Sequence, residues 1–175
     1  MPHRIQELFD DNELVEKIQH RLPHLFHYAE RDCSRGGKVG MEVGSWRERI
    51  LVSLLIVRFG KENVETGLRI TEHEVDVKIF GEPVSIKTLT TTSPRIGAVK
   101  AIWTVEAQQS QEFVRHFRPR VDYWVVHIVW EDTGGMYYIP VEAQDEVFRA
   151  LGRDGYLKLP KGGRIREDSK SRQKP

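Results

Sequence analysis

The segment E-V-D-V-K-I-F-G-E-P-V-S-I-K-T at residues 74–88 constrains the fold more than any other stretch of the sequence. Apolar residues alternate with polar ones on both sides of a central glycine, which is the pattern of two half-buried strands joined by a tight turn. With the turn centred on Gly81 and Glu82, the register places Asp76 directly opposite Lys87 on the polar face. The segment therefore predicts a β-hairpin that presents a carboxylate and an ammonium side by side.

The remaining segments predict an α/β fold around this hairpin. An apolar run at 121–130, V-D-Y-W-V-V-H-I-V-W, is typical of a central strand buried on both faces. Helical periodicity fills the N-terminus, where Pro23 is expected to interrupt it. The expected elements, in order, are a helical region at 3–30, a helix at 45–60, a strand near 66–71, the hairpin, a helix ended by Pro119, the strand at 121–130, a short strand after Gly134-Gly135, and a helix closed by Gly152.

The helix expected at 45–60 has clear start and stop signals. Ser45 is suited to the N-cap, Glu48 completes an S-x-x-E capping box, and Gly60 closes the C-terminus. The helix is apolar nearly all round between Ile50 and Val57, so we expect it to be largely buried. Its capping box gives Glu48 a structural role that needs no active site.

Composition sets broad limits on the class of protein. The chain has 175 residues, of which 39% are hydrophobic and 30% charged, as in a soluble single domain. One cysteine, Cys33, excludes a disulfide framework and a Cys-rich metal site. No apolar run reaches membrane-spanning length and the N-terminus has no signal-peptide pattern, so a cytoplasmic location is expected. The net charge of +1 gives no indication of an anionic partner, although residues 153–175 contain eight basic and three acidic residues.

The simplest explanation for the hairpin pair is a cross-strand salt bridge on a solvent-facing sheet, which contributes at most about 1 kcal/mol. Two features favour a functional site instead. Glu48 begins a line of residues on the preceding helix that should face the core. The later helix and the long strand at 121–130 should enclose the hairpin within a sheet.

Glu48, Asp76 and the S-I-K triplet at 85–87, in the order αβββαβ, resemble the PD-(D/E)xK nuclease superfamily. Within it, the strings M-E-V-G-S-W-R-E, E-V-D-V and V-S-I-K-T are similar to ThaI-type type II restriction endonucleases over about residues 40–130. The resemblance implies a mixed sheet with a restriction-endonuclease-like αβββαβ core and an N-terminal helical extension. We expect one endonuclease domain over 1–175, with the extension at 1–33, the catalytic core at 40–152 and a basic segment at 153–175.

The resemblance implies that Mg²⁺ assists hydrolysis of a phosphodiester bond. Asp76, the backbone carbonyl of Ile86 and Glu48 would be its ligands, and Lys87 would orient or help deprotonate the attacking water or offset phosphate charge. The sequence departs from the family pattern at Ser85, where Asp or Glu is expected. A hydroxyl is a poorer ligand for a hard cation than a carboxylate, which leaves open whether one or two metal ions bind.

The resemblance also implies a double-stranded DNA partner, a short palindromic and CG-rich target, and a homodimer with one active site per strand. The N-terminal helices or the 136–152 element would supply the dimer interface. Basic residues suit phosphates and guanine edges, and a methionine suits insertion between base steps. The candidate DNA-binding residues are Arg35, Lys38, Met41, Arg95, Lys100, Lys161 and Arg164. His127, inside the long strand, is expected to be a hydrogen-bonded core histidine.

Three alternatives remain open from the sequence. The same fold could serve a structure-specific nuclease, such as a junction-resolving or repair enzyme. Ser85 is also compatible with a non-catalytic DNA-binding protein whose site has decayed. A salt-bridged α/β interaction domain without a nucleic-acid partner would explain the hairpin equally simply.

Overall fold

The central strand and the hairpin expected from the sequence form the middle of a five-stranded mixed sheet. A computed structural model of the chain describes residues 4–35, 41–68, 74–95, 99, 107–132 and 134–157. Its elements are η1 (Arg4–Leu8), α1 (Asn12–Arg35), α2 (Met41–Phe59), η2 (Lys61–Asn63), β1 (Val64–Glu65), β2 (Val77–Ile79), β3 (Glu82–Thr91), α3 (Ala107–His116), β4 (Asp122–Val129), β5 (Gly135–Ile139) and α4 (Val141–Tyr156).

The sheet has the strand order β1-β2-β3-β4-β5. Strands β3 and β4 are parallel along eight residue pairs, from Val84 with Asp122 to Thr91 with Val129, and the other neighbours are antiparallel. A parallel pair needs a long crossover connection, and the connection from β3 to β4 contains α3. The expected α/β fold with an αβββαβ order is thus confirmed.

The hairpin forms, but its predicted register is wrong by two residues. The turn consists of Phe80 and Gly81, so that Ile79 pairs with Glu82 and Val77 with Val84. Both turn residues have positive φ, 51° and 82°, as a type I′ hairpin turn requires. A two-residue shift keeps each side chain on its predicted face but changes its neighbour across the strands.

Pro83 explains the shift. A turn at Gly81 and Glu82 would need the backbone N–H of residue 83 to close the hairpin on Phe80, and proline has none. In the observed register Glu82 occupies the closing position. Pro83 pairs with Lys78 at the next position, where the backbone nitrogen points away from β2. The register is therefore set by the one residue of β3 that lacks a donor.

Three helix and strand boundaries also differ from the predictions. Pro23 lies inside α1 and does not interrupt it. Helix α2 begins at Met41, four residues before the predicted N-cap Ser45. The short strand β1 is at Val64–Glu65, and residues 66–68 are not part of a strand. The other two helices and the strands β4 and β5 lie where the sequence predicts them.

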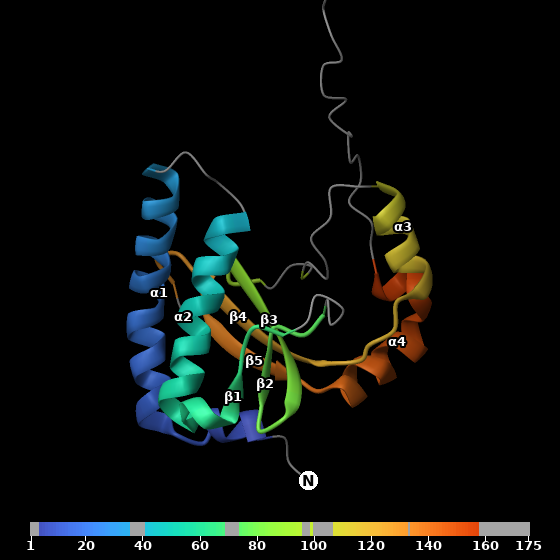
Figure 1. The fold of residues 1–175 in the computed structure, drawn as a ribbon. Helices are drawn as coiled ribbons and strands as arrows, with labels where there is room; N and C mark the ends of the chain where they lie inside the picture. The colour runs from blue at the N-terminus through green and yellow to red at the C-terminus, as the bar shows by residue number, and fades with distance from the viewer. Residues whose placement is uncertain are drawn as a thin grey trace, which may run out of the picture. The chain divides into compact units, whose positions relative to one another are not determined.

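One face of the sheet is covered by α1 and α2, which lie side by side (Figure 1). Residues with even numbers on β3 and β4 point to this face and join the helices in one core. Helix α2 contributes Leu51 and Leu55, both with no exposed surface, but Val57 on its outer side is 83% exposed. The prediction that α2 is largely buried therefore holds for only one of its sides. Buried core members include Phe26, Leu51, Leu55, Val84, Ile86, Trp124, Val126 and Ile128.

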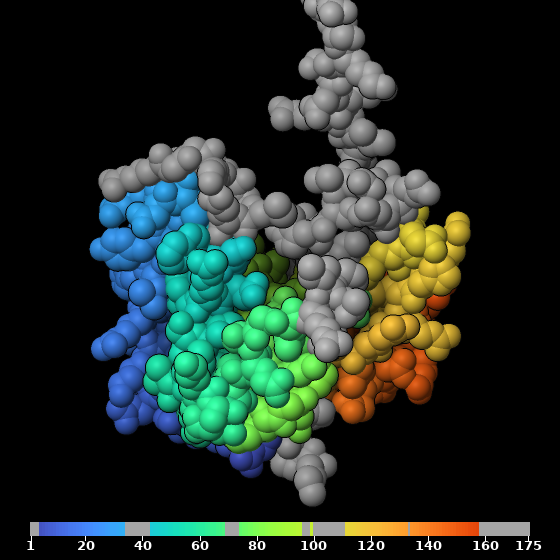
Figure 2. Space-filling model, in the orientation of Figure 1, coloured from blue at the N-terminus to red at the C-terminus, as the bar shows by residue number. Residues whose placement is uncertain are grey.

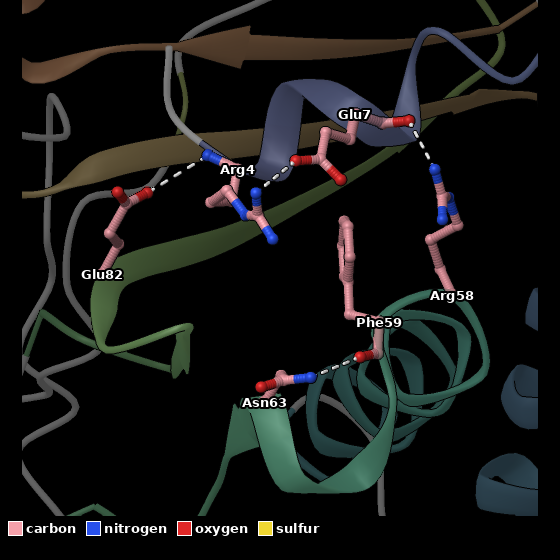
Figure 3. Close-up of polar contacts among 6 residues, drawn as sticks. All are labelled: Arg4, Glu7, Arg58, Phe59, Asn63 and Glu82. Atoms are coloured by element: carbon pink, nitrogen blue, oxygen red, sulfur yellow. Dashed lines mark hydrogen bonds and ion pairs between the residues drawn. The ribbon is translucent and has the colours of Figure 1, made fainter. Parts of the chain in front are cut away.

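The N-terminal η1 joins the hairpin to the end of α2 (Figure 3). The backbone N–H of Arg4 donates to Glu82 at 3.2 Å, and the Arg4 guanidinium lies 3.2 Å from the Glu7 carboxylate. From α2, Arg58 donates to the backbone carbonyl of Glu7 at 3.4 Å. Through these contacts η1 touches both the closed end of the hairpin and the last turn of α2.

The contacts of the chain divide it into two compact units. The first comprises Met1–Lys100 and Val121–Val141, and the second comprises Ala101–Arg120 and Glu142–Pro175. In the second unit Phe117 stacks on Tyr156 with ring centroids 5.9 Å apart. Its helix α4 is kinked at Gly152, where the sequence predicts a helix end. The division into a single domain with an extension, a catalytic core and a basic tail remains a prediction.

No helix in the described ranges is both long and apolar enough to cross a membrane.

Two glycines give a matched test of the turn. Gly81→Ala should lower the free energy of unfolding by about 1 kcal/mol, because alanine is strained at φ 82° although no atom lies within 4 Å of its Cβ position. Gly44→Ala, inside α2 and equally unobstructed, should raise it by about 0.5–1 kcal/mol. Urea unfolding measures both changes. Equal effects of the two substitutions would contradict the assigned turn.

Candidate active site

Asp76 lies immediately before β2 and is held against β3 by three hydrogen bonds. Its backbone N–H donates to the carbonyl of Val84 at 3.0 Å. Its Oδ2 accepts the backbone N–H of Ile86 at 2.6 Å and the hydroxyl of Ser85 at 3.0 Å. The carboxylate therefore has a fixed orientation, and this follows from the corrected register, in which Ser85 rather than Lys87 lies beside Asp76.

Ser85 is completely buried and donates its only hydroxyl proton to Asp76. It holds the carboxylate in place, and a side chain used in this way is poorly suited to act as an exposed ligand. The residue that departs from the expected triplet thus has a structural role within the site.

Ile86 presents its backbone on the same side as Asp76. Its N–H donates to Asp76, and in an extended strand the N–H and C=O of one residue point to the same neighbour. The carbonyl of Ile86 is therefore directed toward the Asp76 side of β3, as expected for a backbone ligand beside this carboxylate.

Lys87 follows two residues after Ser85 on β3 and shares its face of the sheet. Its side chain is half-buried, and its Nζ lies 5.6 Å from the centre of the Tyr123 ring on β4. A cation over an aromatic face is attracted by the ring quadrupole. Tyr123 was not predicted from the sequence, because the pairing of β3 with β4 joins segments far apart in the chain.

Glu48 completes the cluster from α2. Burial raises its pKa above the ordinary 4.5, and the charge of Asp76 raises it further, whereas Lys87 and Arg49 lower it. Asp76 and Lys87 are therefore both near enough to act electrostatically on Glu48. Because α2 begins at Met41, Glu48 lies about two turns inside the helix, and the capping-box explanation for this residue is wrong.

The cluster offers two carboxylates and a main-chain oxygen. Within the described part of the chain, no three His, Cys, Asp or Glu side chains are grouped closely enough to hold a metal ion. Mg²⁺ normally keeps several waters and is bound by only one or two protein carboxylates. The residues present therefore fit a magnesium ion better than they fit a metal with an all-protein ligand cage.

Among the candidate DNA-binding residues, Arg95 has a described side chain. Arg95 is exposed shortly after the end of β3. Arg35 ends α1 and Met41 begins α2, but their side chains lie outside the description. Lys38, Lys100, Lys161 and Arg164 also lie outside the described residues. These assignments remain predictions.

His127 confirms its expected role as a hydrogen-bonded core residue. It is 1% exposed, and its Nε2 lies 2.7 Å from the hydroxyl of Thr91. That hydroxyl also lies 2.6 Å from the carbonyl of Ser93. Since a carbonyl can only accept, the hydroxyl donates to Ser93 and His127 donates from Nε2.

Glu48→Gln should stabilise the metal-free protein at neutral pH and not at acid pH. A raised pKa means that the folded state binds the proton more tightly, so stability decreases as pH rises above about 4.5 through the folded-state pKa. Glutamine never carries the charge and avoids this loss. We expect its melting temperature to exceed that of the wild type by about 1–2 °C at pH 8, because the exposed half of the side chain weakens the effect.

Thermal unfolding at a series of pH values between 4.5 and 8 measures this difference. Glu65→Gln, at an exposed position on β1, is the control and should show no comparable trend. A stabilisation by Glu48→Gln that is largest at pH 4.5 would contradict the raised pKa of Glu48.

Comparisons with known proteins identify the family of the chain. No curated protein matches the chain. A solved structure described as "Restriction endonuclease in complex with substrate DNA" is 52% identical, with a TM-score of 0.81, over 92% of this chain and 76% of that one. The family described as "Restriction endonuclease ThaI" matches residues 8–171. The chain therefore belongs to the ThaI family of restriction endonucleases.

Proposed function

We propose that this protein is a Mg²⁺-dependent type II restriction endonuclease that cuts both strands of DNA at a short palindromic site. The observation that carries the proposal is the fixed carboxylate of Asp76, bonded to Ser85 and Ile86 and electrostatically coupled with Lys87 to Glu48. Membership of a restriction endonuclease family supports the reaction class. The description of the 52% identical relative as a complex with substrate DNA supports the substrate.

Asp76 would be the principal metal ligand. Both side-chain contacts with β3 reach Oδ2, so we assign Oδ1 to the cation. The carbonyl of Ile86 and the carboxylate of Glu48 would complete the protein's share of the ligands. When bound, a hard divalent cation offsets charge on the phosphate and lowers the pKa of a coordinated water. The proton must leave Glu48 for it to bind the cation, so acid conditions should weaken this ligand.

Lys87 would place a positive charge next to this ligand set. It projects from the same face of β3 as Ser85, and Tyr123 supports its ammonium group. From this position it can hold the attacking water by hydrogen bonding or offset charge on the scissile phosphate.

DNA binding would use basic residues that lie close in sequence to the proposed site residues. Arg95 follows β3, the strand that carries Lys87. Arg35, Lys38 and Met41 lie at the connection between α1 and α2, close in sequence to Glu48. A palindromic target cut on both strands implies a two-fold homodimer with one site per strand. We propose a CG-rich target on the resemblance to ThaI-type enzymes.

Digestion of a plasmid with Mg²⁺ and with EDTA tests the proposal. Discrete fragments that require Mg²⁺ are expected, and fragment-end sequencing then gives the target and the cut position. A smear, or cutting confined to branched substrates, would indicate a structure-specific nuclease. DNA retardation without cutting would indicate a non-catalytic DNA-binding protein, and neither binding nor cutting would overturn the proposal altogether.

A further inference from the structure

Arg47 directly precedes Glu48 on α2 and connects three elements of the fold. Its guanidinium forms an ion pair with Glu30 on α1 and donates to the hydroxyl of Thr90 on β3 at 3.3 Å. The guanidinium carbon also lies 5.5 Å from the ring centre of Phe26, a completely buried residue of α1. Side chains of α1 and β3 therefore hold Arg47 of α2 in place.

The environment of Arg47 is unusually enclosed for an arginine. Its side chain is 13% exposed and that of Glu30 is 31% exposed. The Nε of Arg47 is buried and has no hydrogen-bond partner in the described structure. An unsatisfied buried donor costs about 1–3 kcal/mol. Stability alone is a weak reason for such an arrangement, because apolar side chains of similar volume often replace a buried ion pair without loss.

The location of the ion pair suggests what it does. Consecutive residues of a helix point about 100° apart and do not contact each other, so Arg47 cannot act on Glu48 directly. By fixing its own direction toward α1 and β3, Arg47 sets the rotation of this turn of α2 about its axis. In Figure 2 α2, in cyan, lies at the surface between α1 in blue and the β1–β2 region in green. Leu51 is buried in the core one turn later, and the contacts of Arg47 extend this support to the turn of α2 that carries Glu48.

The anchor also involves the strand that carries the site. Thr90 lies on β3 three residues after Lys87 and four after Ile86. A bond from Arg47 to Thr90 therefore fixes the distance between α2 and the segment of β3 that bears both groups. Glu30 fixes the same guanidinium from the opposite helix.

We propose that Arg47, held by Glu30 and Thr90, is a positioning residue that aligns Glu48 of α2 with Asp76 and Lys87 of the hairpin. The inference rests on the proposed function, because it assigns Glu48 to the same site. It predicts that the ion pair contributes to catalysis through geometry, in addition to any contribution to stability.

Arg58 provides a matched control on the same helix. It too has a buried Nε without a partner, donates to a backbone carbonyl of another element, and lies over an aromatic ring, that of Phe59. It is three helical turns beyond Arg47, at the end of α2 remote in sequence from Glu48. Loss of Arg58 should therefore affect stability but leave the alignment of Glu48 intact.

The test compares Arg47→Met, Arg47→Lys, Glu30→Gln and Arg58→Met in the full-length protein. Thermal unfolding gives the fraction folded, so that kcat and KM for DNA cleavage can be expressed per folded molecule. The rise in melting temperature caused by Mg²⁺ without DNA gives a second readout that is independent of catalysis. Arg47→Lys and Glu30→Gln retain more of the contacts around Arg47 than Arg47→Met does. They keep the test informative if Arg47→Met does not fold.

We expect Arg47→Met and Glu30→Gln to lower kcat by about 10–100-fold with little change in KM, and to reduce the Mg²⁺-induced rise. Lysine keeps the charge but not the planar fork, so Arg47→Lys should recover only part of kcat. Arg58→Met should match the wild type in both readouts per folded molecule. Equal kcat values for Arg47→Met and Arg58→Met, or an unchanged Mg²⁺-induced rise in Arg47→Met, would overturn the inference.

Failure of the proposed function would look different. In that case Asp76→Ala would also leave cleavage intact, or the wild type would show no response to Mg²⁺. A loss of cleavage in Asp76→Ala together with normal catalysis by Arg47→Met would reject only the positioning role.

Discussion

Replacement of Asp76 by alanine should reduce DNA cleavage by a factor on the order of 10³ or more, as should replacement of Lys87. Asp76 supplies the carboxylate whose orientation is fixed by Ser85 and Ile86. Lys87 supplies the positive charge on the adjacent part of the strand. Cleavage under single-turnover conditions at saturating Mg²⁺ measures both effects.

Lys78→Ala is the matched control for the lysine variant. Lys78 is a half-buried lysine of the same hairpin, but it pairs with Pro83 near the closed end. It should retain cleavage within a few-fold of the wild type. Asp76→Asn separates charge from shape, because asparagine can still accept the bonds from Ser85 and Ile86. Near-normal cleavage by Asp76→Asn would exclude a metal-ligand role for Asp76.

Ser85→Asp should destabilise the protein severely and should not improve cleavage. The substitution recreates the acidic residue of the usual triplet, yet Ser85 is completely buried and lies within hydrogen-bond distance of Asp76. A second carboxylate at this position would be desolvated and would repel the first. We expect a loss of about 3 kcal/mol in the free energy of unfolding, or roughly 6–12 °C in melting temperature.

Ser85→Ala provides the comparison for this second prediction. It removes one hydrogen bond to Asp76 and leaves that from Ile86, so it should cost about 1 kcal/mol of stability. Because Asp76 is then held less firmly, cleavage should fall by about tenfold or less. Denaturant unfolding and cleavage rates measure both variants. If Ser85→Asp folded normally and cut DNA faster than the wild type, the side chain of residue 85 would instead be a metal ligand.

The sequence predicts the identity of the site better than its contacts. Glu48, Asp76 and Lys87 do come together, because alternation along the hairpin and helical periodicity determine which face each residue occupies. The predicted partner of Asp76 was wrong. The predicted register placed the turn at Gly81 and Glu82. Pro83 has no backbone N–H and cannot close that turn, so the turn forms at Phe80 and Gly81 instead.

The role of Glu48 was ambiguous for a similar reason. Ser45 and Glu48 match a capping box in the local sequence, and local sequence cannot show that the helix starts earlier, at Met41. Arg47 and Tyr123 could not be identified at all, since their roles depend on contacts between segments distant in the chain. Local patterns therefore indicate the proposed ligand residues, and tertiary packing determines which side chains support them.

The pairing of β3 with β4 has a consequence for how the site is assembled. Asp76 contacts residues only nine and ten positions away, whereas β3 residues 84–91 pair with β4 residues 38 positions further along the chain. Contacts close in sequence form with a smaller loss of chain entropy than distant ones. We expect the hairpin that carries Asp76 and Lys87 to form early during folding, and the contact of Lys87 with Tyr123 to form later. The proposed site residues of the hairpin would then be in place first. The slower pairing of β3 with β4 would determine when the site is complete.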